Sequence, residues 1–207
     1  MQNLGRSYTR MLNDTRSLGS ECRGCGRAMR IHRTDLEGVR LIELEPAGDH
    51  RGFFARTYCE REFAAHGLHT SFVQHSTSHT VAHGSIRGMH FQRAPASEVK
   101  VVSCLKGAIY DVVIDLRSSS PTRGRWQGFE LSAVNQHRLY IPVGFAHGFQ
   151  TLTDDVEVGY LISEFYVPEA SGGVLYNDPA FAIRWPLPVT SISEKDKAWP
   201  GYNGSGI

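Results

Sequence analysis

The chain has 207 residues, 41% of them hydrophobic, which is enough for one domain with a sizeable core. Lys and Arg number 22 against 21 Asp and Glu, so a net charge of +1 gives no global field that would attract nucleic acid or anionic lipid. No run approaches the roughly eighteen apolar residues of a membrane span, and the first residues lack the apolar core of a secretory signal. We therefore expect a cytoplasmic protein that binds neither nucleic acid nor a membrane.

The N-terminus differs in composition from the rest of the chain. Residues 1–28 hold five arginines against two acidic residues and show little hydrophobic periodicity, which predicts a poorly ordered basic extension before a domain over 29–207. Cys22 and Cys25 form a CxxC pair in this extension. A structural zinc site needs four ligands, and only His32 lies close in sequence, so we expect no metal site here.

From residue 39 onward the sequence predicts many short strands separated by turn signals. The expected strands cover residues 39–44, 51–58, 71–78, 85–92, 99–105, 108–116, 125–131, 138–141, 148–152 and 156–162. Residues 46–49 read as a turn, and a short helix is expected over 60–66, ended by Gly67. This pattern predicts a mainly β protein of one domain with few short helices, a sandwich or jelly-roll barrel around a cavity.

One strand, 85–92, concentrates residues suited to chemistry. Alternation places His90 and Gln92 on one face of the strand, and Arg87 reaches that face only if Gly88 relaxes the alternation. A glycine inside a strand often marks a bulge or a close approach of two backbones. A lone strand histidine is usually structural, but Arg, His and Gln in one hexapeptide, followed ten residues after the histidine by Lys100, favour a functional site.

This hexapeptide and other motifs in the same order resemble the dTDP-4-dehydrorhamnose 3,5-epimerase family of cupin-type sugar-nucleotide enzymes. The matching motifs, from about residue 39 to 196, are 51–54, 72–74, 87–92, 109–117, 120–122, 141–149, 177–179 and 193–196. The resemblance implies a cupin-like jelly roll and an isomerase of deoxysugar biosynthesis. Its substrate would be a nucleotide-linked 4-keto-6-deoxyhexose, with dTDP-4-dehydro-6-deoxy-D-glucose converted at C3 and C5 to dTDP-4-dehydro-L-rhamnose.

The resemblance also implies that the enzyme needs no cofactor, because the ketone of the substrate already supplies the electron sink. It implies a homodimer in which edge strands are exchanged between subunits. Covering an exposed sheet edge in this way would also suit the physics of β-sheets.

The resemblance assigns roles to four residues. His90 is the base, oriented by Asp196; Tyr160 is the general acid on the opposite face; and Lys100 is the cation beside the enolate oxygen. Without the family, Tyr160 would be read as an aromatic of the barrel wall, and Lys100 as a solvated outward residue.

Substrate binding is assigned in the same way. Positions that contact the nucleotide diphosphate or the sugar in the family are matched by Arg51, Gln74 and Arg87. Tyr166 matches an aromatic residue that stacks on the nucleobase, although a surface tyrosine is the alternative. His147 and Asp111 are expected near the cavity, and either could be purely structural.

Departures from the family pattern leave the reaction open. His75-Ser76 stands where the family often has Asp-Asn, and Val174-Leu175-Tyr176 stands where Arg-Trp is common. They allow a relative that uses another nucleotide, or one that epimerises a single carbon. A 3,4-ketoisomerase of the same fold is a further alternative within the enzyme class.

Two alternatives come from other classes. Residues 142–147 resemble the second metal motif of cupins, as in a metal-dependent dioxygenase, but the stretch around His90 lacks the second histidine and the glutamate of the first motif. A non-catalytic sugar-nucleotide-binding cupin is the other. The joint presence of His90, Lys100, Tyr160 and Asp196 argues against it.

Overall fold

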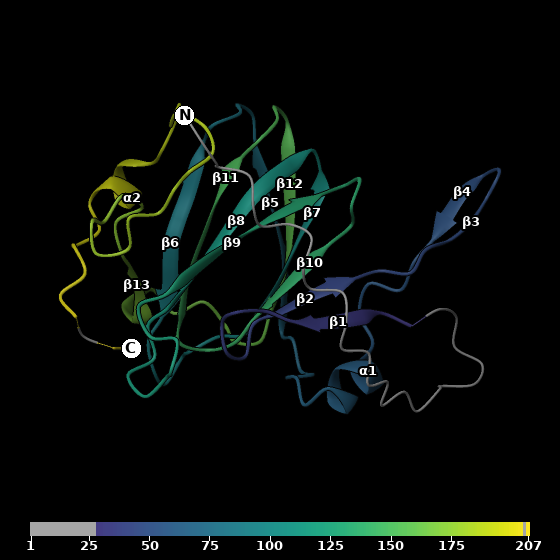
Figure 1. Ribbon diagram of the computed structural model, residues 1–207, viewed down its shortest axis with the longest axis horizontal. Helices are drawn as coiled ribbons and strands as arrows, with labels where there is room; N and C mark the ends of the chain where they lie inside the picture. The colour runs from purple at the N-terminus through teal and green to yellow at the C-terminus, as the bar shows by residue number, and fades with distance from the viewer. Residues whose placement is uncertain (1–27, 205) are drawn as a thin grey trace, which may run out of the picture.

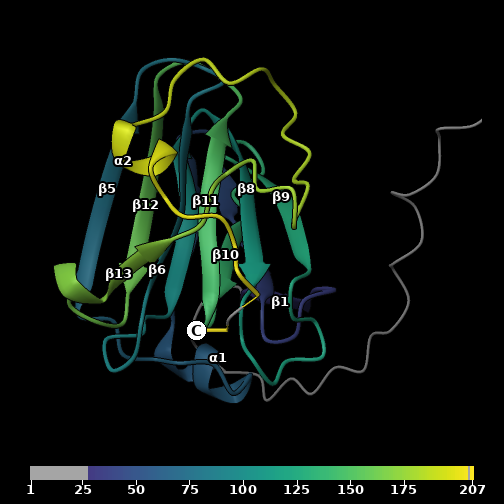
Figure 2. The same ribbon diagram turned by 90° about the vertical axis from the view of Figure 1, so that its left-hand side faces the viewer.

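The computed structural model describes residues 28–204, 206 and 207, which form two facing antiparallel sheets (Figures 1 and 2). One sheet has the order β1 (Arg30–Arg33), β2 (Arg40–Glu43), β10 (Arg138–Ile141), β7 (Lys100–Lys106), β12 (Val156–Ile162), β5 (Gln74–Thr80). The other has the order β13 (Ser171–Gly173), β6 (Ile86–Gln92), β11 (Phe145–Thr151), β8 (Ala108–Asp115), β9 (Trp126–Ser132). The expected mainly β jelly-roll architecture is confirmed.

The expected strand over 51–58 is confirmed only for residues 52–54 and is wrong for 55–58. Two short strands, β3 (Ala47–Asp49) and β4 (Gly52–Phe54), form a separate hairpin that projects from the barrel (Figure 1), so part of the expected turn over 46–49 is also strand. The side chain of Asp49 accepts a hydrogen bond from the backbone N–H of Arg51 at 2.9 Å and closes the hairpin turn. Beyond β4, Ala55 and Tyr58 pack against the apolar cluster beneath the sheet instead of joining a ladder.

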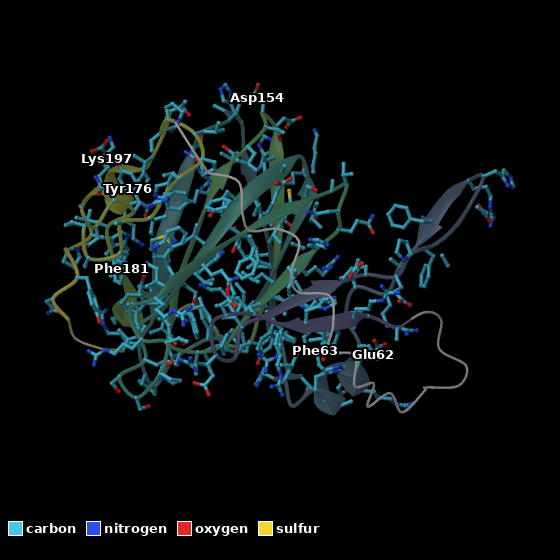
Figure 3. All side chains as sticks on the ribbon, in the orientation of Figure 1. Glu62, Phe63, Asp154, Tyr176, Phe181 and Lys197 are labelled. Carbon is cyan, nitrogen blue, oxygen red and sulfur yellow. The ribbon has the colours of Figure 1, made fainter. Side chains whose placement is uncertain are left out.

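Three apolar clusters hold the barrel and its coverings together. The first lies between the two sheets and includes Leu139 and Phe149. The second covers the outer face of the six-stranded sheet, where Phe63 of helix α1 (Glu60–Ala65) lies beneath β1 and β2 (Figure 3). The third packs the C-terminal segment, with Phe181, against the outer face of β6 and β8 (Figure 3). The C-terminal segment thereby carries the short helix α2 (Glu194–Lys197) to β6.

The glycine in β6 has the role expected for it. Gly88 has φ +142°, and a Cβ there would lie 2.5 Å from Cα of Gly148 on β11. The register between β6 and β11 shifts between His147 and Phe149, so Arg87 and His90 line the same cavity. Both the relaxed alternation and the close backbone approach are confirmed.

The basic extension predicted over 1–28, with Cys22 and Cys25, lies almost entirely outside the described residues and stays a prediction. In the described part of the chain, no helix has the length and apolar character needed to cross a membrane.

Candidate active site

A cavity of about 660 Å³ lies between the two sheets and is closed on one side by the segment that carries α2. The residues predicted for the site that line it are Gln74, Arg87, His90, Lys100, His147, Tyr160, Tyr166 and Asp196. They come from both sheets, from α2 and from the connection between β12 and β13. Arg51 is the exception, and it lies on the projecting hairpin.

His90 and Asp196 form a short pair. Nε2 of His90 lies 2.6 Å from Oδ1 of Asp196, whose side chain is 6% exposed. Burial alone would raise the pKa of the Asp196 carboxyl, but the hydrogen bond and charge of His90, with the backbone N–H of Gly88, outweigh it and lower the pKa. A carboxylate that stays ionised beside an imidazole fixes its tautomer and stabilises its protonated form. This is the arrangement of a histidine base.

The fold supports this carboxylate from several sides. Ser193 caps α2, its hydroxyl accepting a hydrogen bond from the backbone N–H of Asp196 at 3.1 Å. Nε1 of Trp199 donates to Oδ1 of Asp196 at 3.3 Å, and the Trp199 ring meets the His90 ring edge-on. These contacts hold the carboxylate facing β6.

Tyr160 enters the cavity from β12, where its hydroxyl lies 3.1 Å from Oγ of Ser78 on β5. Burial raises the pKa of Tyr160 to about 12, although the Ser78 hydrogen bond acts in the opposite direction. The phenol therefore carries its proton at any physiological pH. It can serve as a proton donor.

Lys100 points into the cavity from the first position of β7 and forms an ion pair with Glu98. The Nζ–Oε1 distance is 2.7 Å, and the side chains are 14% and 11% exposed. A buried carboxylate holds the ammonium group in place while leaving it further donors for an oxygen of a ligand.

His147 and Asp111 face each other on the neighbouring strands β11 and β8. Nε2 of His147 lies 2.9 Å from Oδ2 of Asp111, whose side chain is fully buried. Burial raises the pKa of the Asp111 carboxyl, and the contact with His147 opposes the rise. Only His147 lines the cavity, while Asp111 supports it from behind. Within residues 28–204, 206 and 207, no three His, Cys, Asp or Glu side chains are grouped to bind a metal.

The residues predicted to bind substrate come from both sheets and from the connection after β12. Arg87 donates through Nε to Thr80 and through Nη2 to the carbonyl of His79. The side-chain oxygen of Gln74 accepts from the backbone N–H of Tyr166 at 3.0 Å. Tyr166 is 58% exposed, which leaves its ring available at the cavity mouth.

Arg51 is not brought to this cavity by its own chain. Its side chain is 79% exposed and pairs with Asp49 in the hairpin turn. Phe53 and Phe54 in the same hairpin are 60% and 73% exposed, so the whole hairpin presents apolar and cationic groups away from the barrel.

Sequence reasoning gave no role to three contacts of the site: Glu98, Ser78 and Trp199. Glu98 could have been found, because it stands two residues before Lys100, and alternation continued back from the start of the strand puts both on one face. Ser78 had no such signal, since it meets Tyr160 across 82 positions of the chain. Trp199 donates to the nearby Asp196, but its ring meets His90 from a distant part of the chain.

Comparison with known proteins gives the family of the chain. Residues 33–203 match the family model described as dTDP-4-dehydrorhamnose 3,5-epimerase. A curated relative of that name from Methanothermobacter thermautotrophicus is 43% identical over 173 residues, which is 82% of this chain and 92% of the relative. The chain belongs to the dTDP-4-dehydrorhamnose 3,5-epimerase family. Members named in this way are isomerases.

Solved structures of the family share the fold. The enzyme from Bacillus anthracis, with TDP and diphosphate bound, is 41% identical with a TM-score of 0.82 and matches 84% of this chain and all of its own. An epimerase from Legionella pneumophila, in complex with dTDP-4-keto-L-rhamnose, is 37% identical with a TM-score of 0.79, over 83% of this chain and 92% of its own. The cupin-like jelly roll expected from the sequence is thus the fold of the family.

Proposed function

We propose that this chain converts dTDP-4-dehydro-6-deoxy-D-glucose to dTDP-4-dehydro-L-rhamnose by epimerisation at C3 and C5. The observation that carries the proposal is that the His90–Asp196 pair and the neutral phenol of Tyr160 line one cavity together with Lys100. Membership of the family, whose members bind TDP and dTDP-4-keto-L-rhamnose in solved structures, supports the substrate.

Protons on the carbons beside the ketone are acidic because the carbonyl accepts the electron pair left behind. Nδ1 of His90, the ring nitrogen that Asp196 does not contact, would take the proton, and Asp196 would stabilise the imidazolium. The electron pair moves to the carbonyl oxygen as an enolate, which the ammonium group of Lys100 stabilises. Tyr160 then gives its proton to the opposite face of the carbon, and the ketone re-forms.

After each inversion the two residues must be reset. His90 releases the proton that it took, and the phenolate of Tyr160 regains one, so the overall reaction consumes and produces no protons. The raised pKa of Tyr160, about 12, makes the phenolate a strong base that regains its proton readily.

For the nucleotide, we propose that Arg87 and Gln74 contact the diphosphate and sugar, that Tyr166 stacks on the thymine, and that His147 contacts the sugar. The guanidinium of Arg87 is fixed by Thr80 and by the carbonyl of His79, which leaves Nη1 to donate to an anion.

We further propose that the protein is a homodimer in which the β3–β4 hairpin reaches the partner's cavity and brings Arg51 to the substrate. The hairpin exposes two phenylalanines and a guanidinium beyond the barrel, a surface that a second subunit would cover. Mixing the inactive variants Arg51→Ala and His90→Ala tests this arrangement. If Arg51 acts in the partner's site, mixed dimers contain one complete site and activity returns; if it acts in its own subunit, no activity returns.

The reaction itself is tested by proton NMR of dTDP-4-dehydro-6-deoxy-D-glucose with enzyme in deuterated water. We expect deuterium at both C3 and C5, and none with His90→Ala. Exchange at one carbon only would identify a mono-epimerase. No exchange at either carbon would refute this substrate.

A further inference from the structure

The connection that carries Tyr166 crosses from β12 in one sheet to β13 in the other, and a glutamine from each sheet holds it. Gln74, on β5, accepts from the backbone N–H of Tyr166. Gln92, the last residue of β6, accepts from the N–H of Val167 at 2.7 Å and donates to the carbonyl of Phe165 at 3.2 Å. The backbone on both sides of the exposed Tyr166 ring is therefore anchored by Gln92.

The same amide of Gln92 also contacts Glu98, the residue that pairs with Lys100. Its Nε2 lies 3.1 Å from Oε2 of Glu98, whose other oxygen pairs with Nζ of Lys100 at 2.7 Å. Nε2 also lies 3.0 Å from the carbonyl of Ala96. An amide has only two N–H hydrogens, so three acceptors share them, and a shift of one acceptor changes the hydrogen bonds to the others.

We propose that Gln92 is a positioning residue that couples nucleotide binding at Tyr166 to the placement of Lys100 beside the ketone. The inference rests on the proposed function, which sets the nucleobase at Tyr166 and the sugar at Lys100. The two ends of the substrate are separated by its diphosphate. Gln92, which is 5% exposed, joins them through the protein by way of Glu98.

A matched control exists in the same sheet. Gln150 of β11 is fully buried and anchors a different loop by the same pattern, accepting from the N–H of Leu187 at 3.0 Å and donating to its carbonyl at 2.9 Å. Gln150 does not line the cavity. Replacing Gln150 removes a buried amide that makes the same two kinds of hydrogen bond to a loop, but leaves the contacts around Tyr166 and Lys100 unchanged.

The test compares Gln92→Leu with Gln150→Leu by calorimetric titration with dTDP and by kcat for deuterium exchange. We expect Gln92→Leu to weaken dTDP binding about tenfold, the effect of losing about one hydrogen-bond equivalent at the loop, and to lower kcat about tenfold. Gln150→Leu should lower the melting temperature by about as much as Gln92→Leu does, but leave the dTDP affinity and kcat within twofold of the wild type. The coupling would be overturned if the dTDP affinity or the kcat of Gln92→Leu stayed within twofold of the wild type. It would also be overturned if Gln150→Leu lost as much dTDP affinity and kcat as Gln92→Leu.

Two further variants make the result specific. In a Tyr166→Ala background, adding Gln92→Leu should change dTDP affinity less than twofold, because the Tyr166 ring that Gln92 positions is already absent. A further tenfold loss would contradict the link to Tyr166. If Gln92→Leu does not fold, Gln92→Glu keeps an acceptor for Val167 but sets a carboxylate against Glu98, and an unchanged kcat there would overturn the proposal.

Failure of the proposed function has a different signature. A wild-type protein that catalyses no exchange in dTDP-4-dehydro-6-deoxy-D-glucose would refute that reaction. The dTDP titrations would still test the anchoring of the Tyr166 segment, and an unchanged dTDP affinity of Gln92→Leu would overturn the proposal whatever the reaction.

Discussion

The His90–Asp196 pair can be tested with one isosteric change, Asp196→Asn. The substitution removes the negative charge 2.6 Å from Nε2 of His90 and leaves an amide of the same size. A hydrogen bond to a charged group contributes about 1.5 to 3 kcal/mol, and here it is made to the imidazolium that forms as the substrate proton is taken. Each 1.36 kcal/mol is tenfold in rate, so kcat should fall roughly 10- to 150-fold.

The assay is turnover and deuterium exchange at saturating substrate, with circular dichroism to verify folding. The control is Asp155→Asn, which removes the carboxylate from a histidine–aspartate pair of similar length, 2.7 Å to His79, on the exposed surface. Asp155 has φ +56°, a conformation that asparagine adopts readily. We expect the control to keep kcat within twofold. An Asp196→Asn enzyme that does the same while folded would refute the role of the pair.

Three further outcomes follow from the contacts. Tyr160→Phe should lower the rate of net inversion at least about 100-fold, while the deuterium exchange that His90 catalyses persists. In the wild type the pKa of Tyr160 is about 12, so pH–rate profiles should show no loss of activity from its ionisation below about pH 10. Asp115→Asn should lower the free energy of unfolding by about 3 kcal/mol at pH 7, because the buried carboxylate pairs with Arg117. Burial alone would raise the pKa of Asp115, but the hydrogen-bond donors around it, Arg117 foremost, lower it. The carboxylate therefore contributes its full stabilisation of the fold above the ordinary pKa of 3.8 and loses it as the pH falls below that value. The difference in melting temperature between Asp115→Asn and the wild type should narrow over the same pH range, and a constant difference would contradict this. Leu139→Ala should cost about 3 kcal/mol in urea unfolding, because Leu139 is fully buried between the sheets, and a loss under 1 kcal/mol would show that the core relaxes around the gap.

Local sequence determined much of the barrel. Strands β10 and β12 have the bounds that the pattern predicted, because turn residues flank short apolar runs that are buried on at least one face. Alternation also predicted that His90 and Gln92 share a face, and the glycine between Arg87 and Met89 predicted the irregular backbone that brings Arg87 to the same cavity. These predictions used neighbouring residues alone.

Other features follow from packing between distant segments. The strand expected over 51–58 became a projecting hairpin and a packed connection, since the apolar residues after β4 are buried beneath the sheet and not in a ladder. β13 was not predicted, because three residues with two glycines have no strand pattern and pair with β6 only once the C-terminal segment folds back.

The sequence by itself determined which residue types are available for chemistry, and the motifs that carry the family resemblance placed His90, Lys100 and Tyr160 on strands of one barrel. The family resemblance predicted that Asp196 orients His90, but the contact itself, across 106 positions, is formed only by the tertiary structure. The same holds for the amide of Gln92 on β6, which meets Glu98 beside Lys100 of the other sheet. The reason is physical: strand alternation fixes which face a side chain takes, whereas its partner across the barrel depends on how two sheets and the C-terminal segment pack together.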